Sequence, residues 1–291
     1  MDACNLDRGV SLVIPAYNEA AVIGRAVAEA EAALEQLFGE YEILVVDDGS
    51  NDATAAEVER SRAMYPHVRL LRHPTNRGYG AALRTGFEAG RYNRITFTDA
   101  DCQFDLLDLG RMVPLADEFP IVVGYRVARK DPWRRRFLSR GYNLLARTLL
   151  GTQVRDCDCA LKVFRREVLA ELLPDSRGFF VNTEMLTRAR QLGYAVTELA
   201  VSHRERAGGQ SKVSLWEVPR TFRMLVSFWW REVVTGPRPR PVTILQTRGD
   251  VADDRASHVT LASTPPPVAS RPPSISPAPP VAPPGRHPTA A

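Results

Sequence analysis

The chain has 291 residues, of which 44% are hydrophobic and 25% charged, with a formal net charge of +4 at pH 7. This balance is typical of a globular protein and excludes a wholly disordered, collagen-like or disulfide-scaffold chain. No apolar run approaches the roughly 20 residues of a membrane-spanning helix, and the N-terminus lacks the basic-then-apolar order of a signal peptide. The four cysteines lack zinc-binding spacing and are predicted to be free thiols.

Short apolar strands and helices are predicted to alternate through the first 235 residues. Strands are expected at 10–14, 41–46, 68–72, 94–98 and 121–124. Helices are expected between them at 19–38, 52–64 and 79–89, the second capped by Ser50 or Asn51. This order predicts an α/β domain with a mainly parallel sheet and helices on both faces. Ligands of such sheets bind beyond the carboxyl ends of the strands.

Polar segments follow three of these strands. Pro-Ala-Tyr-Asn-Glu follows the first at 15–19, Asp-Asp-Gly-Ser the second at 47–50, and Asp-Ala-Asp-Cys-Gln the fourth at 99–103. One acidic turn is usually a helix cap, but three at one edge of a sheet favour a binding site.

Asp99 and Asp101 form a D-x-D motif at the end of the fourth strand. Two carboxylates one residue apart can turn toward one divalent cation, and the Gln103 amide can add a neutral oxygen. Oxygen ligands suit Mg²⁺ or Mn²⁺, whose other ligands usually come from water and substrate phosphates. The sequence therefore predicts a metal site formed by Asp99, Asp101 and Gln103.

Basic residues concentrate between positions 126 and 166, which contain twelve Lys or Arg and three Asp. Such a block favours an anionic partner, and nucleic acid is not expected because no reading module is recognisable. Within a helix expected at 133–150, Arg135 and Ser139 are i,i+4 neighbours and can meet one phosphate. A solvated basic face is the alternative.

A second amphipathic helix is expected at 219–234, within a helical segment at 213–235. Its apolar residues recur at helical spacing: Phe222, Leu225, Val226, Trp229 and Val233. Together with nearby arginines and two adjacent tryptophans, this pattern favours a helix lying in a membrane interface. Docking of this helix on the catalytic domain is the alternative.

Proline dominates the end of the chain, with 14 of its 22 prolines between positions 237 and 288. Such a segment cannot bury enough apolar surface to offset chain entropy. We therefore expect a domain at 1–235 followed by a disordered, partly polyproline-like tail at 236–291. A passive tail is favoured over a docking site for a proline-binding or membrane protein.

An ordered set of motifs within residues 10–215 resembles the family 2 glycosyltransferases. The motifs are VSLVIPAYNEAAVI, ILVVDDGSNDAT, NRGYGAALRTGF, FTDADCQFD, VVGYR, RRRFLSRGYNLLARTLLG, RDCDCALKVFRREV, NTEMLTRARQLGY and HRERAGGQSKV. Within that family the resemblance is closest to polyprenyl- and dolichyl-phosphate sugar synthases. It implies a GT-A-type nucleotide-sugar fold and an inverting reaction.

The resemblance also implies a donor site built from several of these motifs. Its residues would be Pro15, Tyr17, Glu19, Asp47, Asp99, Ala100, Asp101, Gln103, Arg126, Arg206 and Lys212. Arg206 and Lys212 belong to an R-x-x-G-x-S-K element that closes over the phosphates. Catalytic roles are implied for Asp99, Asp101 and Arg126, and for Glu184 near the sugar.

On the acceptor side, the resemblance implies that Arg135 and Ser139 hold a lipid phosphate. A phosphate monoester is already mostly dianionic at neutral pH, so it can attack the sugar without a strong general base. A sugar hydroxyl would need a carboxylate base instead, with Asp156 or Glu184 as candidates. For Asp156, capping of a helix at 162–172 is nearly as good an interpretation.

The sequence therefore predicts a metal-dependent glycosyltransferase that uses Mg²⁺ or Mn²⁺ to move a sugar to polyprenyl phosphate. We expect a cytoplasmic enzyme, peripheral at the inner face of the cytoplasmic membrane, with GDP-mannose as the preferred donor and UDP-glucose next. The alternatives are a UDP-sugar enzyme with another acceptor, and a non-catalytic nucleotide-sugar-binding adaptor that works through the tail.

Overall fold

The computed structural model describes residues 9–127, 133–152, 154–178, 180–204, 217–235 and 244–246. Within these ranges the side chains of 133–140, 143, 217–222, 232, 233 and 244–246 are not described. The chain divides into two units, Met1–Gly249 and Asp250–Ala291, and every described residue belongs to the first.

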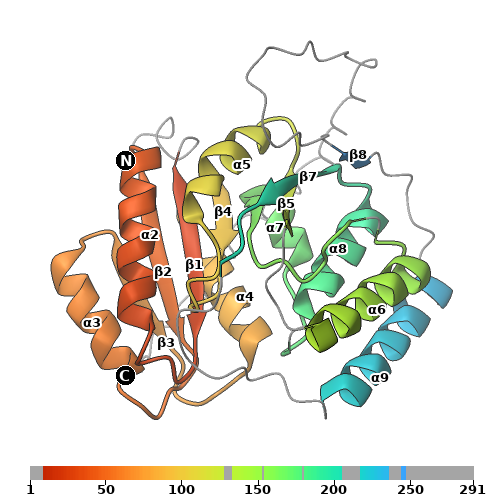
Figure 1. Ribbon diagram of the computed structural model, residues 1–291, viewed down its shortest axis with the longest axis horizontal. Coiled ribbons are helices and arrows are strands. Elements are labelled where there is room, and N and C mark those ends of the chain that lie inside the picture. Colours follow the sequence, from red (N-terminus) through yellow and green to blue (C-terminus); the bar gives the residue numbers. More distant parts are fainter. Residues whose placement is uncertain are drawn as a thin grey trace, which may run out of the picture. The chain divides into compact units, whose positions relative to one another are not determined.

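An eight-stranded sheet in the order β3-β2-β1-β4-β6-β5-β7-β8 forms the centre of this unit (Figure 1). The strands are β1 (Val10–Ala16), β2 (Tyr41–Asp47), β3 (Val68–Arg72), β4 (Arg94–Phe97), β5 (Ile121–Arg126), β6 (Lys162–Arg165), β7 (Val196–Val201) and β8 (Ile244–Gln246). β6 runs antiparallel to both of its neighbours, β4 and β5. All other neighbouring strands are parallel. The expected α/β class with a mainly parallel sheet is therefore confirmed.

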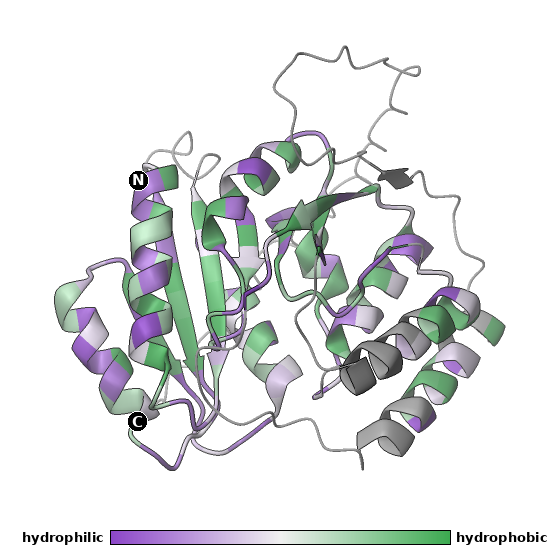
Figure 2. Ribbon diagram, in the orientation of Figure 1, coloured by the Kyte–Doolittle hydropathy of each residue, from purple (hydrophilic) through white to green (hydrophobic). Residues whose placement is uncertain are grey.

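Helices connect most of these strands. They are α2 (Ile23–Leu37), α3 (Thr54–Met64), α4 (Tyr79–Ala89), α5 (Leu109–Leu115), α6 (Trp133–Leu150), α7 (Arg166–Leu172), α8 (Val181–Leu192) and α9 (Glu217–Trp229). A 3₁₀ turn, Leu106–Asp108, precedes α5, and a π-helical turn, Trp230–Val234, follows α9. Figure 2 shows hydrophobic residues concentrated in the strands β1 and β2, whereas the helices alternate hydrophobic and polar residues.

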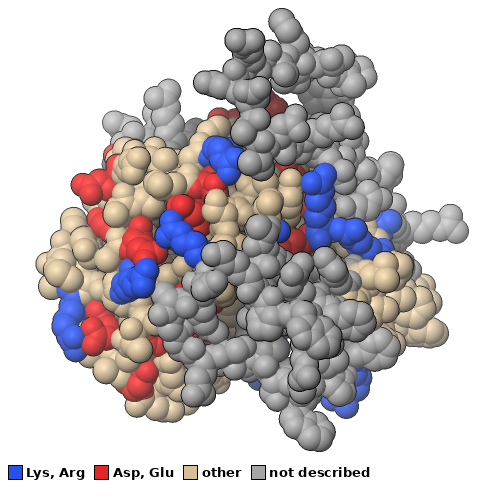
Figure 3. All heavy atoms as spheres, in the orientation of Figure 1, with Lys and Arg blue, Asp and Glu red and all other residues tan. Residues whose placement is uncertain are grey.

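Helices cover both faces of the first half of the sheet. Since crossovers between parallel strands are right-handed, the order β3-β2-β1-β4 places α4 on the face opposite α2 and α3. α4 lies very close to the sheet: a Cβ at Gly86 would be 2.2 Å from the Val13 Cγ1 atom. The outward faces of α2 and α3 bear interspersed acidic and basic side chains (Figure 3). They include the i,i+4 pair Arg25–Glu29 and the i,i+3 pair Arg60–Glu57.

β1 lies where the order of the strands reverses, because β2 follows it on one side and β4 on the other. The chain connections leave β1 and β4 in opposite directions, which opens a crevice at their carboxyl ends. The segments after β1 and β4 are therefore neighbours at the point of the sheet where ligands are expected.

The region 162–172 differs from the prediction of one helix. Residues 162–165 form strand β6, and only Arg166–Leu172 is helical. β6 fills the gap between β4 and β5, so its backbone groups pair on both sides and Val163 and Phe164 are fully buried. Pairing across the sheet outweighs the helical preference of this segment.

The predicted cap of α3 was also wrong. Neither Ser50 nor Asn51 caps the helix; the Asp52 carboxylate instead accepts the Thr54 backbone N–H at 2.9 Å. Ser50 is used elsewhere, because its hydroxyl accepts the backbone N–H of Asn18 in the turn after β1.

α6 and α9 lie side by side (Figure 1) and share a small apolar cluster. Leu225 and Phe228 of α9 are buried against Leu150 and Phe180, with the two phenyl rings 5.1 Å apart. The stripe predicted to face a membrane therefore turns Leu225 inward, which supports the docking alternative for that face. Phe222 and Val233 of the stripe have side chains outside the described residues.

The segment predicted as a tail includes one strand. Ile244–Gln246 forms β8, which pairs with β7 along the edge of the sheet. These residues lie in a proline-free stretch, so their backbone groups can pair with the edge strand. The rest of the predicted tail lies outside the described residues. Within the described ranges, none of the helices has the length and apolarity of a membrane-spanning segment.

Candidate active site

The turn after β1 is held against the turn after β2. The Asn18 side chain accepts the Asn51 backbone N–H at 2.9 Å, and the Glu19 backbone N–H donates to the Thr54 hydroxyl at 2.8 Å. Asn18 adopts a left-handed conformation with φ 51°, which asparagine tolerates better than most residues. Tyr17 and Glu19 are thereby presented, partly exposed, at the rim of the sheet. Pro15 is buried within β1.

Asp47 and Asp48 follow each other at the end of β2 but have different surroundings. Asp47 is buried, accepts the Ser50 backbone N–H at 3.0 Å, and lies 3.1 Å from Nε of Arg72. Asp48 lies 2.6 Å from Nδ1 of His73 and accepts the backbone N–H groups of residues 77 and 78 at 2.9 and 2.7 Å. Asp48 therefore orders the segment that leads into α4.

The two aspartates of the D-x-D motif follow β4. Asp99 accepts the Tyr79 hydroxyl at 2.9 Å, and Asp101 accepts the Gln103 backbone N–H at 3.2 Å. Burial, with the Asp99 and Asp101 charges, raises the pKa of Tyr79 well above its usual value, so the hydroxyl keeps its proton and donates. Ala100, between the aspartates, is buried.

The chemistry of these groups fits Mg²⁺ or Mn²⁺. Asp99 and Asp101 supply carboxylate oxygens, and the Gln103 amide nitrogen donates to the Arg204 carbonyl at 3.4 Å, which leaves the amide oxygen as a ligand atom. In the described part of the chain, no three His, Cys, Asp or Glu residues form a metal-binding group. A cation held here would therefore complete its shell with water or substrate oxygens, as Mg²⁺ commonly does.

The segment after β7 is attached to the D-x-D turn. Phe104 and His203 form an antiparallel bridge with their rings 5.5 Å apart, and the Arg204 backbone N–H donates to the Gln103 carbonyl at 2.7 Å. The Arg204 guanidinium pairs with Asp105 at 2.7 Å. Arg206 and Lys212 lie outside the described residues.

Arg126, at the end of β5, forms a two-pronged ion pair with Asp156. The distances are 2.7 Å from Nε and 2.8 Å from Nη2, and both side chains are more than 90% buried. Burial alone would lower the pKa of Arg126, but the Asp156 carboxylate raises it above its ordinary value. Asp156 therefore does not cap a helix, and both of its oxygens bind Arg126, which leaves it poorly placed to act as a general base.

Lys162, in β6, orders the turn that holds Asp156. Its ammonium group is buried and donates to the carbonyl oxygens of Cys157 and Cys159 and to the Asn182 side chain at 3.0 Å. Burial lowers the pKa of Lys162. The three cysteines among the described residues are free thiols, as predicted.

Glu184 is completely buried in α8 and faces the 174–178 turn. Its two oxygens accept the backbone N–H groups of Asp175 and Ser176 at 3.0 and 2.9 Å, and Arg188 lies 2.9 Å away. Arg135 and Ser139 both belong to α6, one helical turn apart, with side chains outside the described residues.

Sequence reasoning missed Tyr79, which contacts Asp99, and the Arg126–Asp156 pair. The signal for Tyr79 was its position inside the NRGYGAALRTGF motif. Nothing in the local sequence links Arg126 to Asp156, which is 30 residues away.

Comparison with known proteins finds similar sequences over most of the chain. The family model described as Glycosyl transferase family 2 matches residues 11–173. An Aeromonas hydrophila protein named undecaprenyl-phosphate 4-deoxy-4-formamido-L-arabinose transferase is 32% identical over 83% of this chain and 72% of its own length. Glycosyltransferase AglD of Haloferax volcanii is 32% identical over 81% of this chain. The matched region covers only 39% of the length of AglD.

The fold also matches solved structures. Glucosyl-3-phosphoglycerate synthase from Mycobacterium tuberculosis, crystallised with Mn²⁺, UDP and glucosyl-3-phosphoglycerate, aligns with a TM-score of 0.61 and 21% identity. The alignment covers 83% of this chain and 90% of that one. A complex of the same enzyme with Mg²⁺ and UDP aligns with a TM-score of 0.60.

Proposed function

Since this chain belongs to glycosyl transferase family 2, we propose that it transfers a sugar from a nucleotide sugar to a polyprenyl phosphate such as undecaprenyl phosphate. The observation that carries the proposal is the pair Asp99 and Asp101 at the carboxyl end of β4, beside the turn after β1. Its acceptor is supported by relatives named as undecaprenyl-phosphate sugar transferases.

On the donor side, Asp99, Asp101 and the Gln103 amide would hold Mg²⁺ or Mn²⁺ against the diphosphate. A divalent cation there supplies Lewis-acid stabilisation of the charge that develops on the leaving nucleotide. Tyr17, Glu19 and Asp47 would bind the nucleoside, while Arg206 and Lys212 would contact the phosphates.

The acceptor would act as its own nucleophile. A lipid phosphate is largely dianionic at neutral pH and attacks the anomeric carbon without transferring a proton to the protein. The Arg126–Asp156 pair supports this step, because a carboxylate held by a guanidinium is a weak base. Arg126 remains our candidate for contacting the nucleotide-sugar donor, and the Asp156 carboxylate sets the orientation of its guanidinium group. Arg135 and Ser139 would bind the acceptor phosphate.

We also propose a peripheral position at the cytoplasmic face of the membrane, where the protein would reach a lipid acceptor. α9 and the π-helical turn after it support this position, because Val226, Trp230 and Val234 are exposed there. These residues are 38%, 59% and 46% exposed, and Arg223 and Arg231 of the same segment are also exposed. Exposed aromatic and aliphatic residues with flanking arginines suit the interface of an anionic bilayer.

A donor panel tests the proposal. Purified protein is incubated with undecaprenyl phosphate, Mg²⁺ or Mn²⁺, and UDP-linked 4-deoxy-4-formamido-L-arabinose, UDP-glucose or GDP-mannose, and the lipid products are identified by mass spectrometry. UDP-sugars come first, because the relatives named above give no support to mannose, the sugar favoured by the resemblance. Transfer only to a non-lipid acceptor would contradict the proposal of a polyprenyl-phosphate acceptor. Nucleotide binding without turnover would favour an adaptor.

Acceptor binding is tested separately with Arg135→Ala. A guanidinium–phosphate contact is worth about 1.5–3 kcal/mol, so the acceptor KM should rise roughly 10- to 100-fold while donor affinity stays unchanged. A loss of donor binding with a constant acceptor KM would indicate that α6 binds the donor instead of the acceptor.

A further inference from the structure

We propose that Glu184 does not contact the sugar but is a positioning residue, which acts through the 174–178 turn and Tyr79 on the Asp99 carboxylate. This inference rests on the proposed function, in which Asp99 helps to hold the cation that binds the donor diphosphate. Three consecutive contacts connect the two carboxylates.

The first contact is between Glu184 and the turn. Both Glu184 oxygens accept backbone N–H groups, from Asp175 at 3.0 Å and Ser176 at 2.9 Å. Arg188 reinforces the turn, because its guanidinium reaches Glu184, the Leu173 carbonyl and Asp175. A fully buried carboxylate with these hydrogen bonds stabilises the backbone conformation of the turn. It would have to break the bonds to reach a ligand.

The second contact is between the turn and the start of α4. The Gly80 backbone N–H donates to the Arg177 carbonyl at 2.9 Å. A Cβ at Gly80 would lie 1.8 Å from the Ser176 carbonyl oxygen, and one at Gly78 would lie 2.5 Å from the Arg177 carbonyl oxygen. The turn therefore rests directly on backbone that has no room for side chains. Gly78 also has φ 97°, which favours glycine independently.

The third contact is between α4 and the D-x-D motif. Tyr79 stands between these two glycines and donates its hydroxyl to Oδ1 of Asp99 at 2.9 Å. Asp48 holds the preceding backbone from the other side through the N–H groups of residues 77 and 78. The position of the Tyr79 ring is thus set by Asp48 on one side and by the Glu184-bound turn on the other.

Groups that orient a metal ligand typically change metal affinity or activity by 10- to 100-fold when removed. We expect Tyr79→Phe to weaken Mn²⁺-dependent binding of UDP by about 10-fold, with the acceptor KM unchanged. Glu184→Gln should weaken it in the same direction but less, because an amide still accepts one of the two N–H groups.

Binding of UDP with Mn²⁺ is measured by titration calorimetry, and protection of the Gly80 and Ser176 amides by hydrogen exchange. The Gly80 amide should exchange faster in Glu184→Gln. It should remain protected in Tyr79→Phe, because that variant removes only the last of the three contacts, the one between Tyr79 and Asp99.

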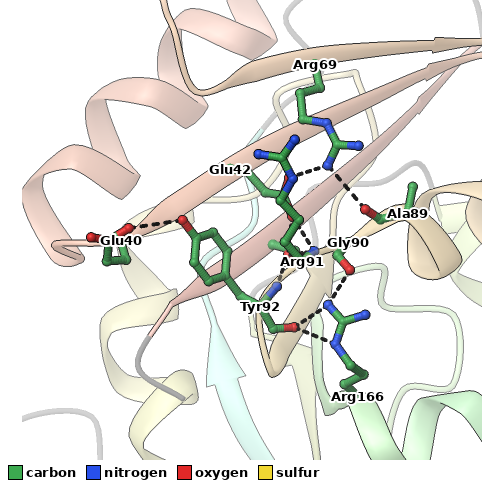
Figure 4. Close-up of polar contacts among 9 residues, drawn as sticks. Glu40, Glu42, Arg69, Ala89, Gly90, Arg91, Tyr92 and Arg166 are labelled. Atoms are coloured by element: carbon green, nitrogen blue, oxygen red, sulfur yellow. Dashed lines mark hydrogen bonds and ion pairs between the residues drawn. The ribbon is translucent and has the colours of Figure 1, made fainter. Parts of the chain in front are cut away.

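Matched controls come from the opposite end of the sheet. There the Tyr92 hydroxyl donates to Glu40 at 3.1 Å, and Glu42 accepts the Arg91 backbone N–H (Figure 4). Tyr92→Phe and Glu42→Gln should leave UDP affinity unchanged.

Three results would overturn the inference. Wild-type UDP affinity in Tyr79→Phe would show that the hydroxyl does not matter to Asp99, with the proposed function intact. Weak UDP binding in Glu184→Gln with normal Gly80 protection would mean that Glu184 contacts the ligand itself. Failure of the wild-type protein to bind UDP or GDP with Mn²⁺ or Mg²⁺ would overturn the proposed function and the inference together.

Discussion

Glu42 at the amino ends of the strands and the D-x-D carboxylates at the carboxyl ends have different described partners. At the amino ends, Glu42 accepts the Ser11 hydroxyl at 2.8 Å and lies 2.5 Å from the Arg69 guanidinium, while Arg166 holds the carbonyl groups of residues 90 and 92 (Figure 4). At the carboxyl ends, Asp99 accepts a tyrosine hydroxyl and Asp101 a backbone N–H. A guanidinium neutralises a carboxylate, whereas a neutral donor orients it without cancelling its charge.

The Glu42 contacts support the structure of the sheet, whereas the D-x-D carboxylates are proposed to hold a cation. The Glu42 cluster connects the 89–93 loop to β1, β2 and β3 and uses protein donors to do so. The Arg126–Asp156 pair is an ion pair like Glu42–Arg69, but it lies at the carboxyl end of β5. Variants at each place can test whether the distinction holds.

The largest effect is expected from Asp101→Ala. Loss of one of two carboxylate ligands should remove several kcal/mol of charge stabilisation, which lowers transfer by at least about 100-fold. The thermal midpoint should remain near that of the wild type, because the lost group is a site carboxylate rather than a packing residue. Full activity in the variant, or undiminished wild-type activity in excess EDTA, would contradict the metal site.

Asp156→Asn should have the largest effect on stability. It leaves the Arg126 guanidinium buried without its counter-charge, and breaking such a pair costs about 3–5 kcal/mol in free energy of unfolding. Denaturant unfolding measures this loss. The double variant Arg126→Met/Asp156→Leu should recover most of it and stay inactive if Arg126 serves the donor. Inactive Asp156→Asn with wild-type stability would instead indicate a general base.

Glu42→Gln should lower stability without affecting catalysis. The amide accepts fewer hydrogen bonds and cannot pair with Arg69, so we expect a loss of about 1–3 kcal/mol in free energy of unfolding. The kcat/KM for transfer should not change at a temperature where the variant is folded. A large loss of kcat/KM would show that the two ends of the sheet are coupled.

The smallest effect is expected at the sheet edge formed by β8. A variant that ends at residue 236 loses the pairing of β8 with β7, which contributes about 1–2 kcal/mol, whereas one that ends at 249 keeps it. Differential scanning calorimetry of the two variants should therefore show a midpoint lower by roughly 2–6 °C only for the shorter one. Equal midpoints would mean that β8 adds nothing to the stability of the sheet.

Several elements of the fold could be predicted from local sequence pattern alone. Apolar runs with polar turn residues after them were enough to locate β1 to β5, and the D-x-D motif at the end of β4 followed from the same logic. The amphipathic period located α6 and α9 within a few residues. These features are local because each depends on residues that are close together in the chain.

Features whose contacting residues lie far apart in sequence could not be predicted in this way. Residues 162–165 became a strand because a gap between β4 and β5 was available to them, and Leu225 turned inward because Leu150 and Phe180 receive it. The roles of the acidic residues were decided in the same way. Asp156 meets Arg126 across 30 positions, and Glu184 accepts two backbone N–H groups of the 174–178 turn. Local periodicity specifies which face of an element is apolar, but a polar side chain acquires its partner only when the sheet brings distant segments together.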